Sequence, residues 1–194
     1  GTCTLSALDE VMQQLDDQIV KTQTMLGSPF IKYLKKPTDE WEKSLKLMTD
    51  VLDEWMSLQK NWMYLEPIFS SEDIVRQMPT EGKKFQGVDA FFRRMMDEAV
   101  EVKLIINVTT QENLLPQFHK FNHEIELILK GLNQYLEMKR LAFPRFFFLS
   151  NDELLEILSQ TKDPLAVNPH LGKCFENIVK LDFDESKPSL DISA

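Results

Sequence analysis

The chain has 194 residues, of which 43% are apolar and 27% are charged, and its formal net charge is −9. This composition is typical of a folded soluble protein, and the length suffices for one domain or two small helical sub-bundles. We expect no nucleic-acid partner, because phosphate binding requires clustered Lys and Arg rather than an acidic surplus. No run of about 18 apolar residues occurs, so no membrane partner is expected either.

The two cysteines, Cys3 and Cys174, are too few for a disulfide framework. The first ten residues, GTCTLSALDE, lack the basic and apolar regions of a secretory signal. Both observations favour a reducing location such as the cytoplasm.

Apolar residues at alternating steps of three and four predict a first helix over residues 5–26, ended at Gly27. A basic connector over 32–37 follows. Thr38 is the predicted N-cap of a second, long helix that Pro67 closes. The apolar positions of this helix cover about half of its circumference, which predicts packing against two neighbours.

Two helices separated by a loop are predicted in the middle of the chain. The cap residues at 70–73 begin a short helix that ends at Met78, and the glycine-containing stretch 80–87 is predicted as a loop. Apolar residues at helical spacing then predict a helix over 88–107.

Thr109 and Glu112 have the spacing of a capping box, which predicts the start of a long helix that ends near Phe143. The run FPRFFFL at 143–149 has no clear period, and both a strand and a buried connector remain open for it.

Ser150 and Glu153 form a second capping-box pattern. The remaining segments are predicted as helix, turn-rich link, short helix and mobile polar tail, at residues 151–160, 163–169, 170–181 and 184–194. The sequence therefore predicts an all-α protein, an elongated antiparallel helical bundle with long helices.

His119 and His123 are four residues apart on one helix, a spacing that suits a metal site. The zinc-protease pattern requires Glu after the first His, but Lys120 stands there. By the helical step, both imidazoles lie toward solvent, which favours a solvated helix face over a metal.

Two other patterns of possible chemical interest are also weak. Cys174 lies one helical turn after His170, but on the apolar side of its helix, which favours a buried, inert thiol. The EGKK stretch at 81–84 lacks the first glycine and the Ser or Thr of a phosphate loop. We predict no catalytic, cofactor-binding or metal-ligating residue.

Aromatic residues are abundant, with 13 Phe and 3 Trp. Most of them are expected in the core. Apolar residues beyond the needs of a core often mark partner sites, so part of the FPRFFFL run is a candidate contact surface.

Three long stretches resemble the linker region of dynein heavy chains, and the resemblance covers nearly the whole chain, weakening mainly over 100–119. They are WMYLEPIFSSEDIVRQMPTEGKKFQGVD at 62–89, LKGLNQYLEMKRLAFPRFFFLSNDELLEILSQTKDP at 129–164 and NPHLGKCFENIVKLDF at 168–183. The form LEPIFSSEDI followed by EGKKF looks more like the axonemal (ciliary or flagellar) dyneins than the cytoplasmic ones. The resemblance assigns residues 5–183 to a linker fragment, with a possible break near 80–87.

This resemblance implies a rod of helical bundles that lies across a ring of AAA+ modules and bends as the ring hydrolyses ATP. It implies ATP and magnesium in the ring of the parent chain and no cofactor in this fragment. The implied partners are the AAA+ ring of the same heavy chain, other dynein subunits and microtubules, in the cytoskeleton of the axoneme.

A bending rod needs a hinge, and the breaker residues Gly82, Gly87, Phe143 and Pro144 are our candidates. For docking onto the ring we choose Arg145, Phe146 and Phe147, because aromatic and Arg side chains dominate contact hot spots. Core phenylalanines are an equal alternative. Two other functions also remain open, a static spectrin-like scaffold and a metal-dependent enzyme using the two histidines.

Overall fold

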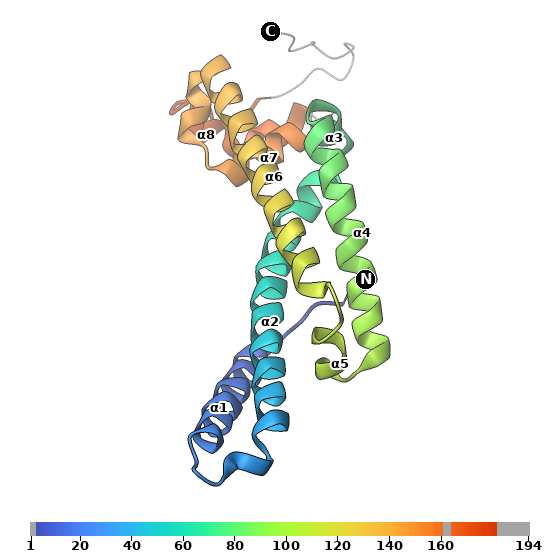
Figure 1. The fold of residues 1–194 in the computed structure, drawn as a ribbon. Coiled ribbons are helices and arrows are strands. Elements are labelled where there is room, and N and C mark those ends of the chain that lie inside the picture. The colour runs from blue at the N-terminus through green and yellow to red at the C-terminus, as the bar shows by residue number, and fades with distance from the viewer. Residues whose placement is uncertain (1–2, 161–163, 182–194) are drawn as a thin grey trace. The chain divides into compact units, whose positions relative to one another are not determined.

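The computed structural model describes residues 3–160 and 164–181, and helices make up most of these two ranges (Figure 1). Eight α-helices and three 3-10 helices occur in these two ranges, with no strand among them. The predicted all-α fold is therefore confirmed. The chain divides into unit 1 (Gly1–Glu66 with Lys83–Ile128) and unit 2 (Pro67–Gly82 with Leu129–Ala194).

Unit 1 begins with α1 (Leu8–Leu26), the 3-10 helix η1 (Ile31–Tyr33) and most of α2 (Lys35–Phe69). The prediction that Thr38 caps α2 is wrong, because the helix has already begun at Lys35. The Thr38 hydroxyl is buried and donates a hydrogen bond of 2.7 Å to the carbonyl of Leu34. A helical threonine satisfies its hydroxyl in this way, so a cap-forming residue type does not fix where the helix starts.

α1 and α2 run antiparallel in unit 1 (Figure 1). Near the turn, the side-chain amide of Gln23 donates to Glu42 at 3.1 Å. At the other end, the amide of Gln59 accepts from the Leu5 N–H at 2.8 Å and donates to the Leu5 carbonyl at 3.0 Å. Leu5 thus lies before the first helix, not within it as predicted, and Gln59 ties that segment to α2.

α4 (Pro79–Val102) contains the residues predicted as the loop 80–87, so that prediction is wrong. Pro79 is the first helical residue, a position where a proline loses no hydrogen bond. The same proline that indicated the end of one helix therefore also begins the next. Gly82 donates its N–H to the carbonyl of Met78 at 2.9 Å, and Gly87 lies further along in the helix. Burial of the apolar face of α4 offsets the poor helix propensity of these glycines.

The helix predicted over 88–107 ends earlier, at Val102, because Lys103 has a left-handed φ of 61°. The short helix α5 (Ile105–Thr109) follows. The capping box predicted at Thr109 and Glu112 is wrong, since the Thr109 hydroxyl donates to the carbonyl of Ile105 at 2.8 Å within α5.

α6 (Leu114–Ala142) begins after Asn113, whose φ of 64° is left-handed, and ends where the sequence predicts. Asparagine tolerates this conformation better than most residues.

The end of α2 also differs from the prediction. Pro67 is expected to close this helix, but it lies within the last turn, and the helix continues to Phe69.

Unit 2 contains the end of α2, α3 (Glu72–Gln77), the start of α4, the end of α6 and a series of short elements. The short elements are η2 (Pro144–Phe148), α7 (Asn151–Ser159), η3 (Pro164–His170) and α8 (Leu171–Cys174). The FPRFFFL run is therefore a 3-10 helix, and neither a strand nor a buried connector.

The capping box at the start of α7 is confirmed. The Glu153 N–H donates to the Ser150 hydroxyl at 3.3 Å, and the Ser150 N–H donates to the Glu153 carboxylate at 2.9 Å. The helix predicted over 170–181 ends already at Cys174, because the backbone of Phe175 is extended. The tail predicted at 184–194 lies outside the described residues.

Candidate functional site

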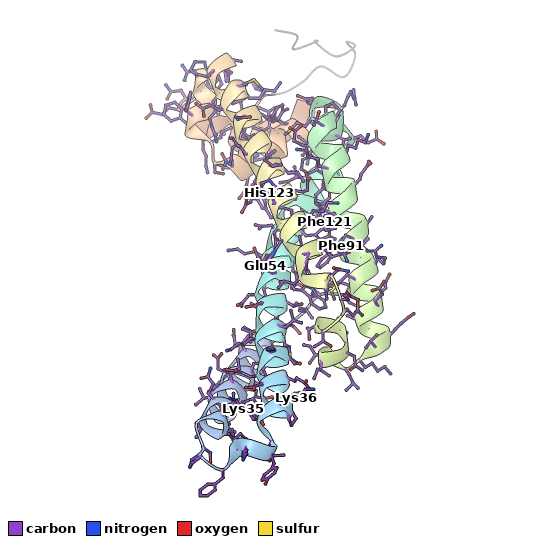
Figure 2. The ribbon with its side chains drawn as sticks, in the orientation of Figure 1. Lys35, Lys36, Glu54, Phe91, Phe121 and His123 are labelled. Atoms are coloured by element: carbon purple, nitrogen blue, oxygen red, sulfur yellow. The ribbon has the colours of Figure 1, made fainter. Side chains whose placement is uncertain are left out.

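Two parts of the molecule qualify as functional features, a tightly packed helical core in unit 1 and an exposed phenylalanine run in unit 2. The core of unit 1 contains an aromatic cluster contributed by α2, α4 and α6. Trp55 of α2 lies 5.7 Å from Phe118 of α6, between ring centroids. Phe91 of α4 packs edge-on to Phe118 at 5.5 Å and stacks on Phe121 at 4.3 Å (Figure 2). Three long helices are thus interlocked through rings that pack at preferred distances.

A polar clamp joins α2 and α4 beside this cluster. The Trp62 indole N–H donates to the Asp89 carboxylate at 2.9 Å, and Arg93 Nε donates to the same carboxylate at 2.8 Å. Arg93 also reaches Glu66 at 3.4 Å, and its guanidinium lies 5.3 Å from the centre of the Trp62 ring. The hydrogen bond to Asp89 raises the pKa of Arg93, whose guanidinium is charged at physiological pH in any case.

Sequence reasoning placed Trp62 in the core but missed the clamp. Its members lie 27 residues apart in the sequence, on helices whose pairing no local pattern specifies. The one local signal is the four-residue spacing of Asp89 and Arg93, which suits a charge pair on one helix face.

Glu54 of α2 contacts two side chains of α6 in unit 1 (Figure 2). The side-chain amide of Asn122 donates to the Glu54 carbonyl at 2.9 Å and to its carboxylate at 2.6 Å. His119 lies 3.5 Å from the same carboxylate, and His123 lies 3.5 Å from Glu126. Both imidazoles are exposed, which confirms that the histidine pair is on the solvent side of its helix.

Within 3–160 and 164–181 no group of three or more His, Cys, Asp or Glu side chains is arranged to hold a metal ion. In the same ranges no helix is both long and apolar enough to cross a membrane. Cys3 is exposed and Cys174 is buried, and both are free thiols. Cys174 is thus buried as predicted, and burial raises the pKa of its thiol, which disfavours the thiolate form.

The three predicted docking residues, Arg145, Phe146 and Phe147, have different surroundings in unit 2. Arg145 donates to the carbonyl of Cys174 at 2.8 Å, and its guanidinium lies 4.6 Å from the centre of the Phe175 ring. Phe146 is half-buried and packs edge-on against Phe143 at 4.8 Å. Arg145 therefore holds η2 to the end of α8 and the residue that follows it, whereas Phe146 packs against the residue before η2.

Phe147 and its neighbour Phe148 instead face solvent, with 53% and 68% of their surface exposed. Sequence reasoning missed Phe148. The period of a 3-10 helix is three, but the sequence does not indicate where its buried face lies. Met138 and Leu141, on the last turns of α6, are also exposed.

The predicted hinge at Phe143 and Pro144 coincides with the end of α6. Phe143 is extended and donates its N–H to the carbonyl of Lys139 at 3.0 Å. Arg140 spans this break, since its guanidinium donates to the Leu149 carbonyl at 3.2 Å and to the Asn151 side chain at 2.7 Å. The hinge role of this break, and that of Gly82 and Gly87, stays a prediction.

Unit 2 contains a buried histidine that lies beside two glutamates of α7. His170 is buried, with its ring nitrogens 3.8 Å from Glu153 and 3.3 Å from Glu156. Lys173 forms a short ion pair with Glu153, and this bond together with the Ser150 N–H lowers the pKa of Glu153 to about 2.

A second polar contact in unit 2 joins α6 to α3. The Tyr135 hydroxyl donates to the Gln77 side chain at 2.5 Å, and burial raises the pKa of Tyr135 to about 12.

These features define an all-α protein whose described residues include interlocked long helices in unit 1 and exposed aromatic side chains in unit 2. The chain belongs to the dynein heavy chain family, because all of residues 1–194 match the family described as "Dynein heavy chain, N-terminal region 2".

Three relatives are named as axonemal heavy chains. The chain is 54% identical over its full 194 residues to human dynein axonemal heavy chain 12, of which it covers 6%. It is 54% identical over 182 residues, 94% of its length, to human dynein axonemal heavy chain 3, and 53% identical over 184 residues, 95% of its length, to dynein axonemal heavy chain 1 of Rattus norvegicus. It covers 4% of each of these two relatives, so it corresponds to a small part of a very long polypeptide.

Proposed function

We propose that this chain is a mechanical linker segment of an axonemal dynein heavy chain. In this role it relays ATP-driven changes of the AAA+ ring into movement along microtubules. ATP and magnesium bind in the ring of the parent chain, and the partners are that ring, other dynein subunits and the microtubule. The location is the axoneme of a cilium or flagellum.

The observation that carries this proposal is the interlocking of α2, α4 and α6 in unit 1. A lever that transmits force must resist bending, and close-packed interiors have low compressibility. The aromatic cluster around Phe118 and the clamp around Asp89 connect all three helices by both packing and directed hydrogen bonds. Helix sliding would break several of these contacts at once.

The names of the relatives support a motor over a static scaffold, because each of the three is a dynein heavy chain. The metal-dependent enzyme has no support from the described side chains around His119 and His123, each of which pairs with a single carboxylate.

Within this proposal, Phe147 is the docking candidate that the structure favours. It is exposed, whereas Arg145 is engaged with Cys174 and Phe175 in its own unit. Phe148 is equally available and extends the surface. Arg145 then acts as the support that fixes η2, and the two phenylalanines contact the ring.

The test replaces Arg93 by Met in a full-length heavy chain that carries this segment. The variant removes the bonds of Arg93 to Asp89 and Glu66 while keeping a side chain of similar length, so we expect slower microtubule gliding with the ATP turnover of the ring retained. Arg94→Met is the matched control, because Arg94 is exposed and makes only loose contacts, a pair of 3.8 Å with Glu98 and a guanidinium 5.9 Å from the centre of the Phe91 ring. A static scaffold predicts equal gliding velocity for both variants, and that result would contradict the lever.

A further inference from the structure

The turn between α1 and α2 presents aromatic side chains to solvent. Phe30 and Tyr33 have 89% and 92% of their surface exposed, and Leu34 is also exposed. We call residues 28–37 the α1–α2 tip. Large apolar side chains exposed to this degree add nothing to the core of unit 1, so the fold does not explain their presence.

The α1–α2 tip is also a basic segment of an acidic chain. It holds Lys32, Lys35 and Lys36 and no acidic residue, whereas the chain as a whole has a net charge of −9. All three lysines are exposed, and in 3–160 and 164–181 none of them forms an ion pair. Lys35 and Lys36 lie at the start of α2, where the helix dipole adds to their positive potential (Figure 2). Lysines at this end of a helix oppose its stability, so they are not there to stabilise α2.

The backbone of the tip is ordered by its own hydrogen bonds. The Ile31 N–H donates to the Ser28 carbonyl at 3.2 Å, and the Leu34 N–H donates to the Ile31 carbonyl at 2.7 Å. The Thr38 N–H and hydroxyl both donate to the Leu34 carbonyl, at 3.0 and 2.7 Å. The aromatic and basic side chains are therefore held on a preformed turn, which reduces the entropy lost when a partner binds.

We propose that the α1–α2 tip binds an acidic protein segment that carries apolar side chains. Carboxylates of the partner pair with Lys32, Lys35 and Lys36, and its apolar side chains cover the rings of Phe30 and Tyr33. Charge complementarity favours this partner, because the tip is a positively charged segment of a chain with net negative charge.

The same charge pattern argues against extended polyanions such as nucleic acids and anionic membranes. Attraction between exposed charges extends only about 8 Å at physiological ionic strength. A short acidic segment contacts the tip alone, whereas a rod or sheet of negative charge also approaches the acidic surface elsewhere on the chain. Acidic residues of α1, such as Asp16 and Asp17, and of α2, such as Glu40, would repel it.

The experiment measures binding of the 194-residue chain to a fluorescein-labelled peptide of four Glu-Glu-Leu repeats, by anisotropy at low and physiological salt. We expect saturable binding that weakens with salt. The triple charge reversal K32E/K35E/K36E should weaken it by roughly tenfold or more, because three screened attractions become repulsions. The double variant F30A/Y33A should weaken it several-fold while the salt dependence stays unchanged.

The matched control for charge is K43E/K60E/K130E, three exposed lysines outside the tip with the same change in net charge. It should bind within about twofold of the parent, since distant surface charges are screened. Tip variants should not fall below the thermal midpoint of the parent, because the replaced side chains are not part of the core and Glu at the start of α2 suits the helix dipole. This separates lost binding from lost folding.

Three results would overturn the proposal. They are no binding of the Glu-Glu-Leu peptide, equal weakening by the tip and control charge reversals, and tighter binding of a 12-mer of dT or of phosphatidylserine vesicles than of the peptide. None of these results bears on gliding by the full motor, so the lever proposal stands or falls separately.

Discussion

The two units of the chain are stabilised in different ways. Unit 1 is built from long helices, and its largest fully buried side chains are Trp55, Phe92 and Phe118. Unit 2 has mostly short elements, joined by hydrogen bonds such as those of Ser71 to the Ser159 carbonyl and Tyr135 to Gln77.

This difference teaches what each unit is suited to do. Packing of long helices gives resistance to deformation, since every displacement opens a void. Short elements joined by caps and single polar bonds have lower local stability and rearrange at lower cost. Under the lever function proposed above, unit 1 would be the stiff part, and unit 2, with its exposed Phe147 and Phe148, would be suited to making and breaking contacts.

The largest expected effect tests the packing of unit 1. Replacing Phe118 by Ala removes a fully buried ring that contacts Trp55 and Phe91, and should lower the free energy of unfolding by about 3–5 kcal/mol. Urea denaturation followed by tryptophan fluorescence measures the change. Phe148→Ala in unit 2 is the matched control, and its effect should stay within about 0.5 kcal/mol because the ring is exposed. Equal losses would contradict the contrast between the two phenylalanines.

The second effect concerns the clamp of unit 1. Asp89→Ala leaves the Trp62 indole N–H and Arg93 Nε without their acceptor, which should cost about 1–3 kcal/mol. Asp97→Ala on the same helix is the control, since Asp97 is exposed, and it should change stability little. If chemical denaturation gives the same midpoint for both variants, the clamp is not a stabilising feature.

The third effect tests a single cap in unit 2. Ser150→Ala removes the acceptor of the Glu153 N–H at the start of α7 and should cost about 1 kcal/mol. Circular dichroism of the thermal transition detects it as a fall in Tm of ~2–4 °C. Ser150→Asp keeps an acceptor at the cap and should restore most of the loss; an equally low Tm for that variant would exclude the cap as the cause.

The helices that the sequence predicted correctly are those with a long apolar stripe or a complete cap. The apolar stripe of α6 and the capping box at Ser150 and Glu153 are both local patterns. Whether such a pattern forms its helix or its cap depends mainly on residues that are close in the sequence. The predicted loop at 80–87 failed because a proline followed by glycines signals a break only where no buried face continues through it. The stripe of α4 does continue, and tertiary packing overrides the low propensity of its glycines.

The candidate site was less accessible from the sequence. Arg145 and Phe147 were chosen together, but one is tied to Cys174 and the other is exposed. That distinction depends on contacts with a segment 29 residues further along, which no local pattern encodes. The α1–α2 tip was read only as a basic connector, because the exposure of Phe30 and Tyr33 depends on which faces of α1 and α2 meet.

The fourth effect compares two glycines. A methyl group at Gly87 of α4 meets nothing within 4 Å, so Gly87→Ala should raise stability by about 0.5–1 kcal/mol through helix propensity. At Gly131 of α6, the added carbon would lie 2.8 Å from the Glu81 carboxylate and 2.9 Å from its Cγ, so Glu81 must move. Gly131→Ala should gain less than Gly87→Ala, or lose stability, as measured by urea midpoints. A larger gain at Gly131 would contradict this packing of α4 against α6 within unit 2.

The smallest effect is a pH dependence in unit 2. The Lys173 bond and the Ser150 N–H lower the pKa of Glu153 from 4.5 to about 2. The unfolded chain therefore binds a proton at Glu153 more readily than the folded chain does. The contribution of Glu153 is fully present above pH 4.5 and disappears as the pH falls toward 2. Because Glu153 pairs near the surface, solvent screens the interaction and the effect is small.

The measurement compares Tm of the parent and of Glu153→Gln between pH 7 and pH 2. The parent should be the more stable at neutral pH, and the difference should close through the interval between pH 4.5 and pH 2. Glu176→Gln, at an exposed position in the same unit, should follow the parent throughout. The Gln side chain is a neutral acceptor that can still bind the Ser150 N–H, so the expected loss of stability comes from the missing charge alone. A difference in Tm that persists undiminished at pH 2 would contradict this and would mean that the Glu153→Gln substitution disturbs the capping box itself.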